Sequence, residues 1–327
     1  MKRFSTLLLV LSLLNGCATR EVMNVSELEP GRLPAPDTTL NIAGLGPCTD
    51  SPDRRLRLDS RQPIHVLVHG CYGSSGQFRG LAQVLAFHGQ QSACFTYDDR
   101  AKLAHSATGL SHALAQLAEQ SRIPKITVIG HSQGALIARK SLTQPLPTLP
   151  SRLVDISLVT ISGPFSGIES ARTCGKVWLY PFTLGVMPFS CYVVTGPKWA
   201  DITYSSRFIR EPGVLDPQII EYVKIDTDER DSCRRLEGER CVKDDDVFSL
   251  AEQRNSLVEN DARARRVEVK AGHVEIVGDK RVAPTKLIAI LQQQGVIRPT
   301  SPAQLSAFNL LLSQVYQDEG LLTYPKD

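Results

Sequence analysis

The chain lacks the features that mark several other classes of protein. Its 37 lysines and arginines are nearly balanced by 34 aspartates and glutamates, and no basic patch with interleaved aromatic residues is present. Nucleic acid is therefore not an expected partner. There is no C-x-x-C spacing and no Cys/His cluster, so the cysteines do not suggest a metal site. There is also no internal repeat and no low-complexity tract.

The apolar stretch near the amino terminus is too short to cross a bilayer. Lys2 and Arg3 precede Leu7 to Leu14, and the stretch closes at Leu14-Asn15-Gly16-Cys17. This pattern predicts a cleaved export signal over residues 1–16. Its ending resembles the lipobox of bacterial lipoproteins, which implies that Cys17 is diacylated. The alternative is an ordinary signal peptide with an incidental cysteine.

The segment that follows the signal is typical of a tether. Residues 17–45 contain Pro30, Pro34 and Pro36, mixed charges and few large apolar side chains, so we expect a flexible linker there. The remaining residues 46–327 are long for one domain but suit an α/β enzyme with an inserted cap.

Cysteine usage indicates an oxidising compartment. The chain has eight cysteines, and lipidation of Cys17 leaves an odd number, so at least one other thiol is free or paired between molecules. Proximity in sequence predicts the bridges Cys174–Cys191 and Cys233–Cys241. A third bridge would join two of Cys48, Cys71 and Cys94, and the sequence does not select the pair.

Short β-branched runs alternate with helical patterns along most of the chain. This alternation predicts a mainly parallel sheet flanked by helices, an α/β fold. We expect strands at 64–68, 92–97, 125–129, 156–161, 219–225 and 267–270. Helices are expected around Leu81 to Leu85, around Leu110 to Leu117, and over 284–293 and 302–317.

Residues 125–134, KITVIGHSQG, have the pattern of a nucleophile elbow. A strand ends in G-x-S-x-G and leads into a helix, which places Ser132 on a sharp, strained turn. Gly130 and Gly134 would remove side chains where strand and helix cross, and the helix amino terminus would favour an oxyanion beside Ser132. The alternative is an ordinary turn before a helix.

A second motif, VLVHGCYG at 66–73, carries a family resemblance. Together with the elbow it resembles the α/β-hydrolase family, and within it the bacterial lipases and lipase-like esterases. The resemblance implies that the backbone N–H groups of Cys71 and Gln133 form the oxyanion hole. It also implies that His69 stabilises its loop and is not the catalytic base.

The family's chain order is nucleophile, acid, histidine. His273 is the last histidine and the only one after Ser132, so it is the expected base. The segment DDDVFS at 244–249 resembles the family's acid loop, and alignment on its apolar residues favours Asp245, followed by Asp246 and Asp244. Asp98 and Asp99, in contrast, are adjacent on an extended chain and indicate a structural turn.

The resemblance extends to a cap inserted at about residues 164–212. TISGPFSG at 160–167 resembles a lipase segment T-x-x-T-P-H-x-G, but Gly163 and Phe165 depart from it, which puts the family roles of those two positions in doubt. DITYSSRF at 201–208 resembles a later D-L-x-x-x-S-x-F segment. Between them lies an aromatic stretch that would either form an acyl-binding pocket or pack on the sheet. Its members are Trp178, Tyr180, Phe182, Met187, Phe189, Tyr192 and Trp199.

These observations predict a serine hydrolase that cleaves lipid or other acyl esters through an acyl-enzyme, with a Ser132–His273–Asp245 triad. No metal or organic cofactor is needed for this chemistry. The lipobox implies a membrane anchor at Cys17 and, because Ala18 and not aspartate follows, an outer membrane location facing the periplasm. An acyltransferase on the same fold and a non-catalytic envelope docking protein remain alternatives, and no protein partner is identified.

Overall fold

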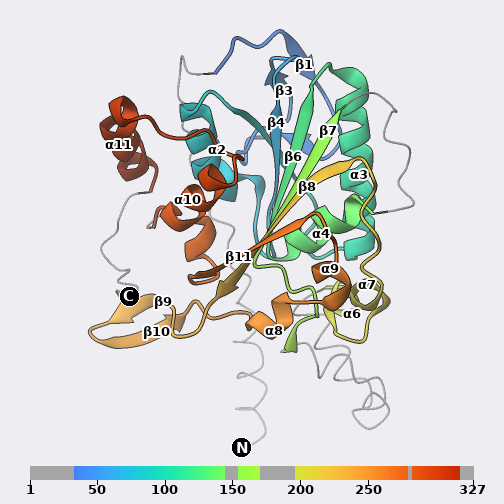
Figure 1. Ribbon diagram of the computed structural model, residues 1–327, viewed down its shortest axis with the longest axis vertical. Coiled ribbons are helices and arrows are strands. Elements are labelled where there is room, and N and C mark those ends of the chain that lie inside the picture. Colours follow the sequence, from blue (N-terminus) through green and yellow to red (C-terminus); the bar gives the residue numbers. More distant parts are fainter. Residues whose placement is uncertain (1–32, 144–153, 170–195, 279–281, 317–327) are drawn as a thin grey trace, which may run out of the picture.

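The computed structural model describes residues 33–143, 154–169, 196–278 and 282–316. Its centre is a seven-stranded sheet in the order β11-β8-β7-β6-β4-β5-β2 (Figure 1). All neighbouring pairs are parallel except β2 with β5. The prediction of a mainly parallel sheet is confirmed.

Each predicted strand is present, with small changes of boundary. The strands of the sheet are β2 (Leu45–Gly46), β4 (Ile64–Val68), β5 (Gln91–Phe95), β6 (Lys125–His131), β7 (Asp155–Ile161), β8 (Ile219–Asp228) and β11 (Ala264–Lys270). The largest changes, of three residues each, are in β8, which continues to Asp228, and in β11, which begins at Ala264; these two strands stay paired in register from Tyr222 to Asp228.

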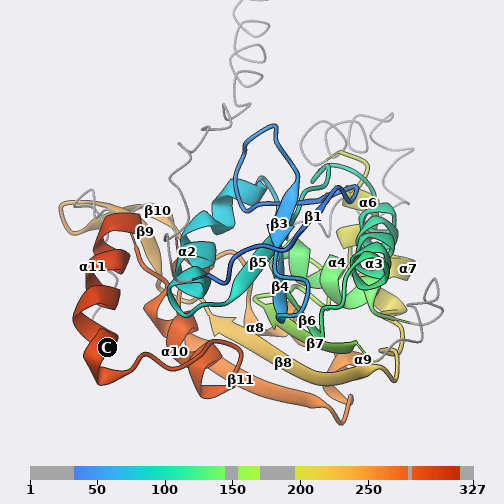
Figure 2. The same ribbon diagram turned by 90° about the horizontal axis from the view of Figure 1, so that it is seen from above.

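Helices cover both faces of the sheet (Figure 2). One face carries α3 (Leu103–Gln120) and α4 (Gln133–Ser141), and the other carries α2 (Arg79–Phe87), α10 (Thr285–Gln293) and α11 (Leu305–Val315). The shorter helices are η2 (Ser75–Phe78), α6 (Trp199–Ile202), α7 (Arg207–Arg210), α8 (Leu250–Gln253), α9 (Ser256–Glu259), η5 (Glu275–Val277) and η6 (Pro302–Gln304). No helix in the described ranges is long and apolar enough to cross a membrane.

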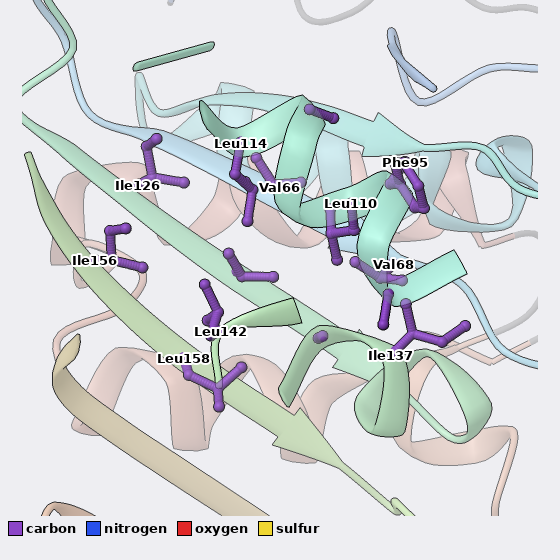
Figure 3. Packing of buried hydrophobic residues seen from close by; sticks show 14 of the residues in the cluster. Val66, Val68, Phe95, Leu110, Leu114, Ile126, Ile137, Leu142, Ile156 and Leu158 are labelled. Carbon is purple, nitrogen blue, oxygen red and sulfur yellow. The ribbon is translucent and has the colours of Figure 1, made fainter. Parts of the chain in front are cut away.

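Successive side chains of each strand point to opposite faces of the sheet, and they contribute to two hydrophobic cores. In β4, Val66 and Val68 pack toward α3 and α4, while Leu67 packs toward α2 and α10. Figure 3 shows the first of these cores, with Val66 and Val68 beside Leu110 of α3 and Ile137 of α4. Because a sheet buried on both faces needs apolar residues at every position, its strands read as continuous apolar runs.

The folded domain begins earlier than residue 46. Strand β1 (Thr38–Leu40) pairs with β3 (Leu56–Leu58), and Leu40, Ile42 and Leu45 are buried. The expected tether over 17–45 is therefore corrected at its carboxyl-terminal end, because these apolar side chains pack against the sheet edge.

Two disulfides lie in the described residues. Cys233–Cys241 closes the antiparallel hairpin of β9 (Cys233–Glu237) and β10 (Arg240–Asp244), as predicted. Cys48–Cys94 selects the pair that the sequence left open, and Cys71 is the free thiol of that trio. The predicted Cys174–Cys191 bridge lies outside the described residues.

The carboxyl ends of the parallel strands meet at one edge of the sheet, at the bottom of Figure 1. There the chain leaves β4 at His69, β6 at Ser132, β8 at Glu229 and β11 before His273. This edge is where α/β sheets bind their ligands.

Two glycine substitutions test how closely β6 and α4 cross. A Cβ at Gly130 would lie 2.3 Å from the Gly134 carbonyl oxygen, whereas one at Gly109 of α3 would meet only Phe95, at 3.6 Å. We expect Gly130→Ala to lower the free energy of unfolding by about 2–3 kcal/mol. Gly109→Ala should raise it by roughly 0.5–1 kcal/mol, because alanine favours the helix. Denaturant unfolding with the disulfides intact measures both, and equal effects would contradict the tight crossing.

Candidate active site

Ser132 lies at the turn between β6 and α4 with the backbone strain of a nucleophile elbow. Its φ is 57° and its ψ is −125°, a region that residues with a Cβ rarely occupy. The turn is fixed on both sides, since the Ser132 N–H donates to the Ile161 carbonyl at 2.9 Å and the Ala135 N–H donates to the Ser132 carbonyl at 3.0 Å. The local structure thus has the form expected from G-x-S-x-G.

The His-Gly loop lies directly against this turn. A Cβ at Gly70 would be 3.0 Å from the Ser132 Cβ, and one at Gly134 would be 2.2 Å from the Val68 carbonyl oxygen. Cys71 follows Gly70, and Gln133 begins α4. Within the described residues, neither the Cys71 nor the Gln133 N–H donates a hydrogen bond. Two free amides beside a serine form the kind of site that stabilises an oxyanion.

His69 supports this loop, as the resemblance implied. Its ring stacks on Tyr97 with centroids 4.3 Å apart, and its Nδ1 is 3.0 Å from the Gly70 carbonyl oxygen. The Tyr97 hydroxyl donates to the His69 carbonyl at 2.6 Å. Burial raises the pKa of Tyr97 well above its usual value, so the hydroxyl remains a donor at neutral pH.

His273 is held by a glutamate at the end of β8. Its Nδ1 is 2.8 Å from Glu229 Oε1, and both side chains are buried. Glu229 also accepts hydrogen bonds from the Thr227 hydroxyl at 2.8 Å and from the Val247 and Phe248 N–H groups at 2.7 and 2.8 Å. With Nδ1–H donating to this carboxylate, Nε2 is left as the acceptor of a proton.

The structure therefore corrects the expected acid. Asp245 is buried, but its carboxylate accepts from the backbone N–H groups of Val274, at 3.1 Å, and Glu275, at 3.0 Å. Its carbonyl accepts from the His273 N–H at 2.9 Å. Burial is the main cause that raises the pKa of Asp245. Asp245 thus supports the loop that carries His273, while Glu229 contacts the imidazole.

Glu229 was missed because the sequence pattern ended β8 too early. The apolar run stops at Ile225, and the predicted strand ended there, before Glu229. The position of Glu229 in the sequence could have indicated its role, because an acid at the carboxyl end of a parallel strand lies at the ligand-binding edge of the sheet. Glu229 also satisfies the order nucleophile, acid, histidine.

His131 ties the elbow to the His273 loop. Its Nε2 is 2.9 Å from the His273 carbonyl oxygen, and the two rings lie 4.7 Å apart. Burial lowers the pKa of His131 well below its usual value, so the neutral ring donates Nε2–H to that carbonyl. No hydrogen bond joins the Ser132 hydroxyl to His273 in the described part of the chain. Such bonds are often long without substrate and tighten when it binds.

The two departures from the lipase segment have a structural context. A Cβ at Gly163 would be 2.8 Å from the Ala135 Cβ, so a threonine would not fit against α4. Phe165 is buried, with the Lys224 ammonium 5.6 Å from its ring centroid. Most of the predicted aromatic cap, from Trp178 to Tyr192, lies outside the described residues.

Other candidate sites are not supported. In the ranges described, no group of three or more His, Cys, Asp or Glu side chains is arranged to hold a metal. A polar hollow of about 560 Å³, lined by residues such as Arg61 and Arg122, lies beside the segments that lead into β4 and β6. That is the opposite edge of the sheet from Ser132.

Comparison with known proteins gives a family match over part of the chain. Residues 60–187 match the family described as "Putative serine esterase (DUF676)". That match includes the His-Gly loop and the elbow. A search of curated proteins finds no match.

Solved structures give the fold. The propeptide form of Bacillus licheniformis lipase BlEst2 is 14% identical with a TM-score of 0.51, over 81% of this chain and 54% of that one. The mature form of the same lipase is 14% identical with a TM-score of 0.49, over 79% and 98%. Esterase B from Lactobacillus rhamnosis is 11% identical with a TM-score of 0.46, over 86% and 89%. The α/β-hydrolase fold and the prediction of an ester-hydrolysing serine enzyme are confirmed.

Paired substitutions distinguish the two acids. We expect Glu229→Gln to lower kcat by about 10⁴-fold, because an amide facing Nδ1 favours the wrong imidazole tautomer. Asp245→Asn should lower it by less than about 10-fold, since the amide oxygen still accepts a loop N–H and the imidazole contact is kept. Steady-state hydrolysis of a nitrophenyl ester measures both. The reverse ranking would return the acid role to Asp245.

Proposed function

We propose that this serine hydrolase of the α/β-hydrolase fold cleaves carboxylic esters with a triad of Ser132, His273 and Glu229. The observation that carries the proposal is the 2.8 Å contact between His273 Nδ1 and the buried Glu229 carboxylate, at the sheet edge where Ser132 occupies its strained turn. The contact orients the imidazole, and the strained turn presents the hydroxyl.

In the acylation half-reaction, His273 Nε2 takes the proton of the Ser132 hydroxyl as its oxygen attacks the ester carbonyl. Negative charge moves to the carbonyl oxygen, which the N–H groups of Cys71 and Gln133 stabilise. Glu229 stabilises the imidazolium without taking its proton. The tetrahedral intermediate collapses when His273 gives that proton to the leaving alcohol, and the acyl group stays on Ser132.

In the deacylation half-reaction, the same groups act on water. His273 takes a proton from water as it attacks the acyl carbon, and the same two amides hold the second oxyanion. Collapse releases the carboxylic acid and returns the proton to Ser132. An acyltransferase would differ only in accepting an alcohol at this step.

Lipids and other acyl esters are the proposed substrate class. Tyr72, beside the proposed oxyanion hole, is 70% exposed, and Val247, whose N–H contacts Glu229, is 49% exposed. Apolar side chains at the site's edge favour an apolar acyl or alcohol group. The aromatic sequence between Trp178 and Tyr192 adds to this preference.

We propose that the protein is located in the bacterial envelope and is attached to the membrane by lipid on Cys17. The short apolar stretch that ends at Gly16-Cys17 favours lipid attachment, and two acyl chains give a firm anchor. The two disulfides of the described residues are consistent with export to an oxidising compartment.

Removal of the nucleophile tests the reaction. Ser132→Ala should lower ester turnover by roughly 10⁶-fold, since a triad without its serine has no acyl-enzyme route. A panel of nitrophenyl esters of rising chain length measures turnover, and a fluorophosphonate probe should label the wild type at Ser132. Added alcohol acceptor distinguishes hydrolysis from acyl transfer. Retained turnover would move the nucleophile elsewhere, and absence of labelling in oxidised wild-type protein would favour a docking role.

Removal of the lipidation site tests the anchor separately. Cys17→Ser should abolish incorporation of labelled palmitate and release the protein from the membrane fraction, because the thiol is the acyl acceptor. Esterase activity per molecule should be unchanged, since Cys17 has no part in the proposed triad or oxyanion hole. Membrane association that persists in the variant without label would contradict a lipid anchor.

A further inference from the structure

A buried lysine lies beside the proposed oxyanion hole and has no part in the triad. The side chain of Lys198 is 1% exposed. Its ammonium donates to the Asp99 carbonyl at 2.6 Å and contacts the Cys71 Sγ at 2.8 Å. It also lies 5.3 Å from the centroid of the Tyr72 ring. Burial of an ammonium is costly unless it is paired, so these contacts call for an explanation.

Asp99 connects Lys198 to both proposed oxyanion donors. Its carbonyl also accepts from the Gln133 side-chain amide at 3.1 Å, and its carboxylate accepts from the Tyr72 N–H at 2.7 Å. The Asp99 carboxylate lies 3.7 Å from the Lys198 ammonium. One aspartate therefore contacts the lysine, the first residue of α4 and the segment from Gly70 to Tyr72, which we call the oxyanion loop.

The oxyanion loop needs such support because its backbone is strained. Tyr72, the residue after Cys71, has a φ of 56°, and a side chain in this region costs about 1–3 kcal/mol unless its surroundings hold it. The Tyr72 ring is largely exposed, so it contributes little packing. The hydrogen bond from its N–H to the Asp99 carboxylate helps to fix this backbone.

The segment that carries Lys198 is itself attached to the Asp99 turn. The Lys198 N–H donates to the Arg100 carbonyl at 3.4 Å, and the Asp201 carboxylate accepts from the Leu103 N–H at 2.8 Å. A Cβ at Gly196 would be 2.8 Å from the Arg100 Cβ. These contacts place the lysine before any substrate binds.

We propose that Lys198 and Asp99 form a clamp that positions the Cys71 and Gln133 amides for the oxyanion, with Lys198 as a positioning residue. The inference rests on the proposed function, because it assigns a role within the same site. The lysine contacts the loop through Cys71 and Asp99, and its buried ammonium brings a positive charge to the loop that carries the proposed oxyanion donor Cys71. Such a charge stabilises the transition state more than the bound ester.

Lys198→Met tests the clamp. We expect kcat for a short, soluble ester to fall about 10- to 100-fold with KM nearly unchanged, because the lost stabilisation acts in the transition state. Affinity for a boronic acid, which forms a tetrahedral anion on serine, should fall by the same factor as kcat/KM. Affinity for the product carboxylate should stay the same.

Lys140→Met is the matched control. The Lys140 ammonium also donates to a backbone carbonyl, that of Glu211 at 2.7 Å, but on a segment that does not contact the oxyanion loop. This variant should keep the wild-type kcat and boronic acid affinity. Asp99→Ala is the second test variant; its side chain lies in a partly exposed turn, and it should also lower kcat with little change in KM.

The outcomes separate the two claims. A wild type that hydrolyses esters while Lys198→Met and Asp99→Ala keep full kcat overturns the clamp alone. Equal loss of boronic acid and product affinity overturns it too, because that pattern indicates general damage to the site. A wild type that neither hydrolyses esters nor reacts with fluorophosphonate overturns the proposed function and the clamp with it. If Lys198→Met does not fold, the result for Asp99→Ala decides.

Discussion

The site depends on how closely strand β6 and helix α4 cross. Gly130 and Gly134 have no side chains, so the helix can start against the carbonyls that end β4. This contact places the Ser132 turn beside the loop of Gly70 and Cys71. A Cβ at either glycine would separate the nucleophile from the amides proposed to hold its oxyanion. The strained backbone of Ser132 persists because hydrogen bonds on both sides determine it.

Two buried acidic side chains near His273 have different roles. Glu229 contacts the imidazole of His273, and its oxygens are satisfied by a hydroxyl and two backbone N–H groups. Asp245 instead holds the loop that carries His273. A buried carboxylate without such partners would be costly. The surrounding loops therefore supply the donors that let both acids stay buried.

Local patterns in the sequence predicted the strands and the elbow. Contacts between residues far apart in the sequence could not be predicted in this way. The strands were predictable because buried parallel strands are continuous apolar runs. The elbow was predictable because a strand and a helix that cross closely need glycines at the crossing, and these glycines lie near the serine in the sequence. The acid was not, since Glu229 and Asp245 both follow Ser132 and precede His273. Only the register of β8 beside β11 places Glu229 at the imidazole. The clamp of Lys198 and Asp99 joins residues 99 positions apart and has no local signal.

The most direct test of the account is the crystal structure of the protein after reaction with a phosphonate ester. We expect phosphorus bonded to the Ser132 oxygen, with one phosphonyl oxygen about 3 Å from the N–H groups of both Cys71 and Gln133. His273 should then lie between the adduct and Glu229. A phosphonate on another residue, or an oxygen directed away from both amides, would contradict the proposed site.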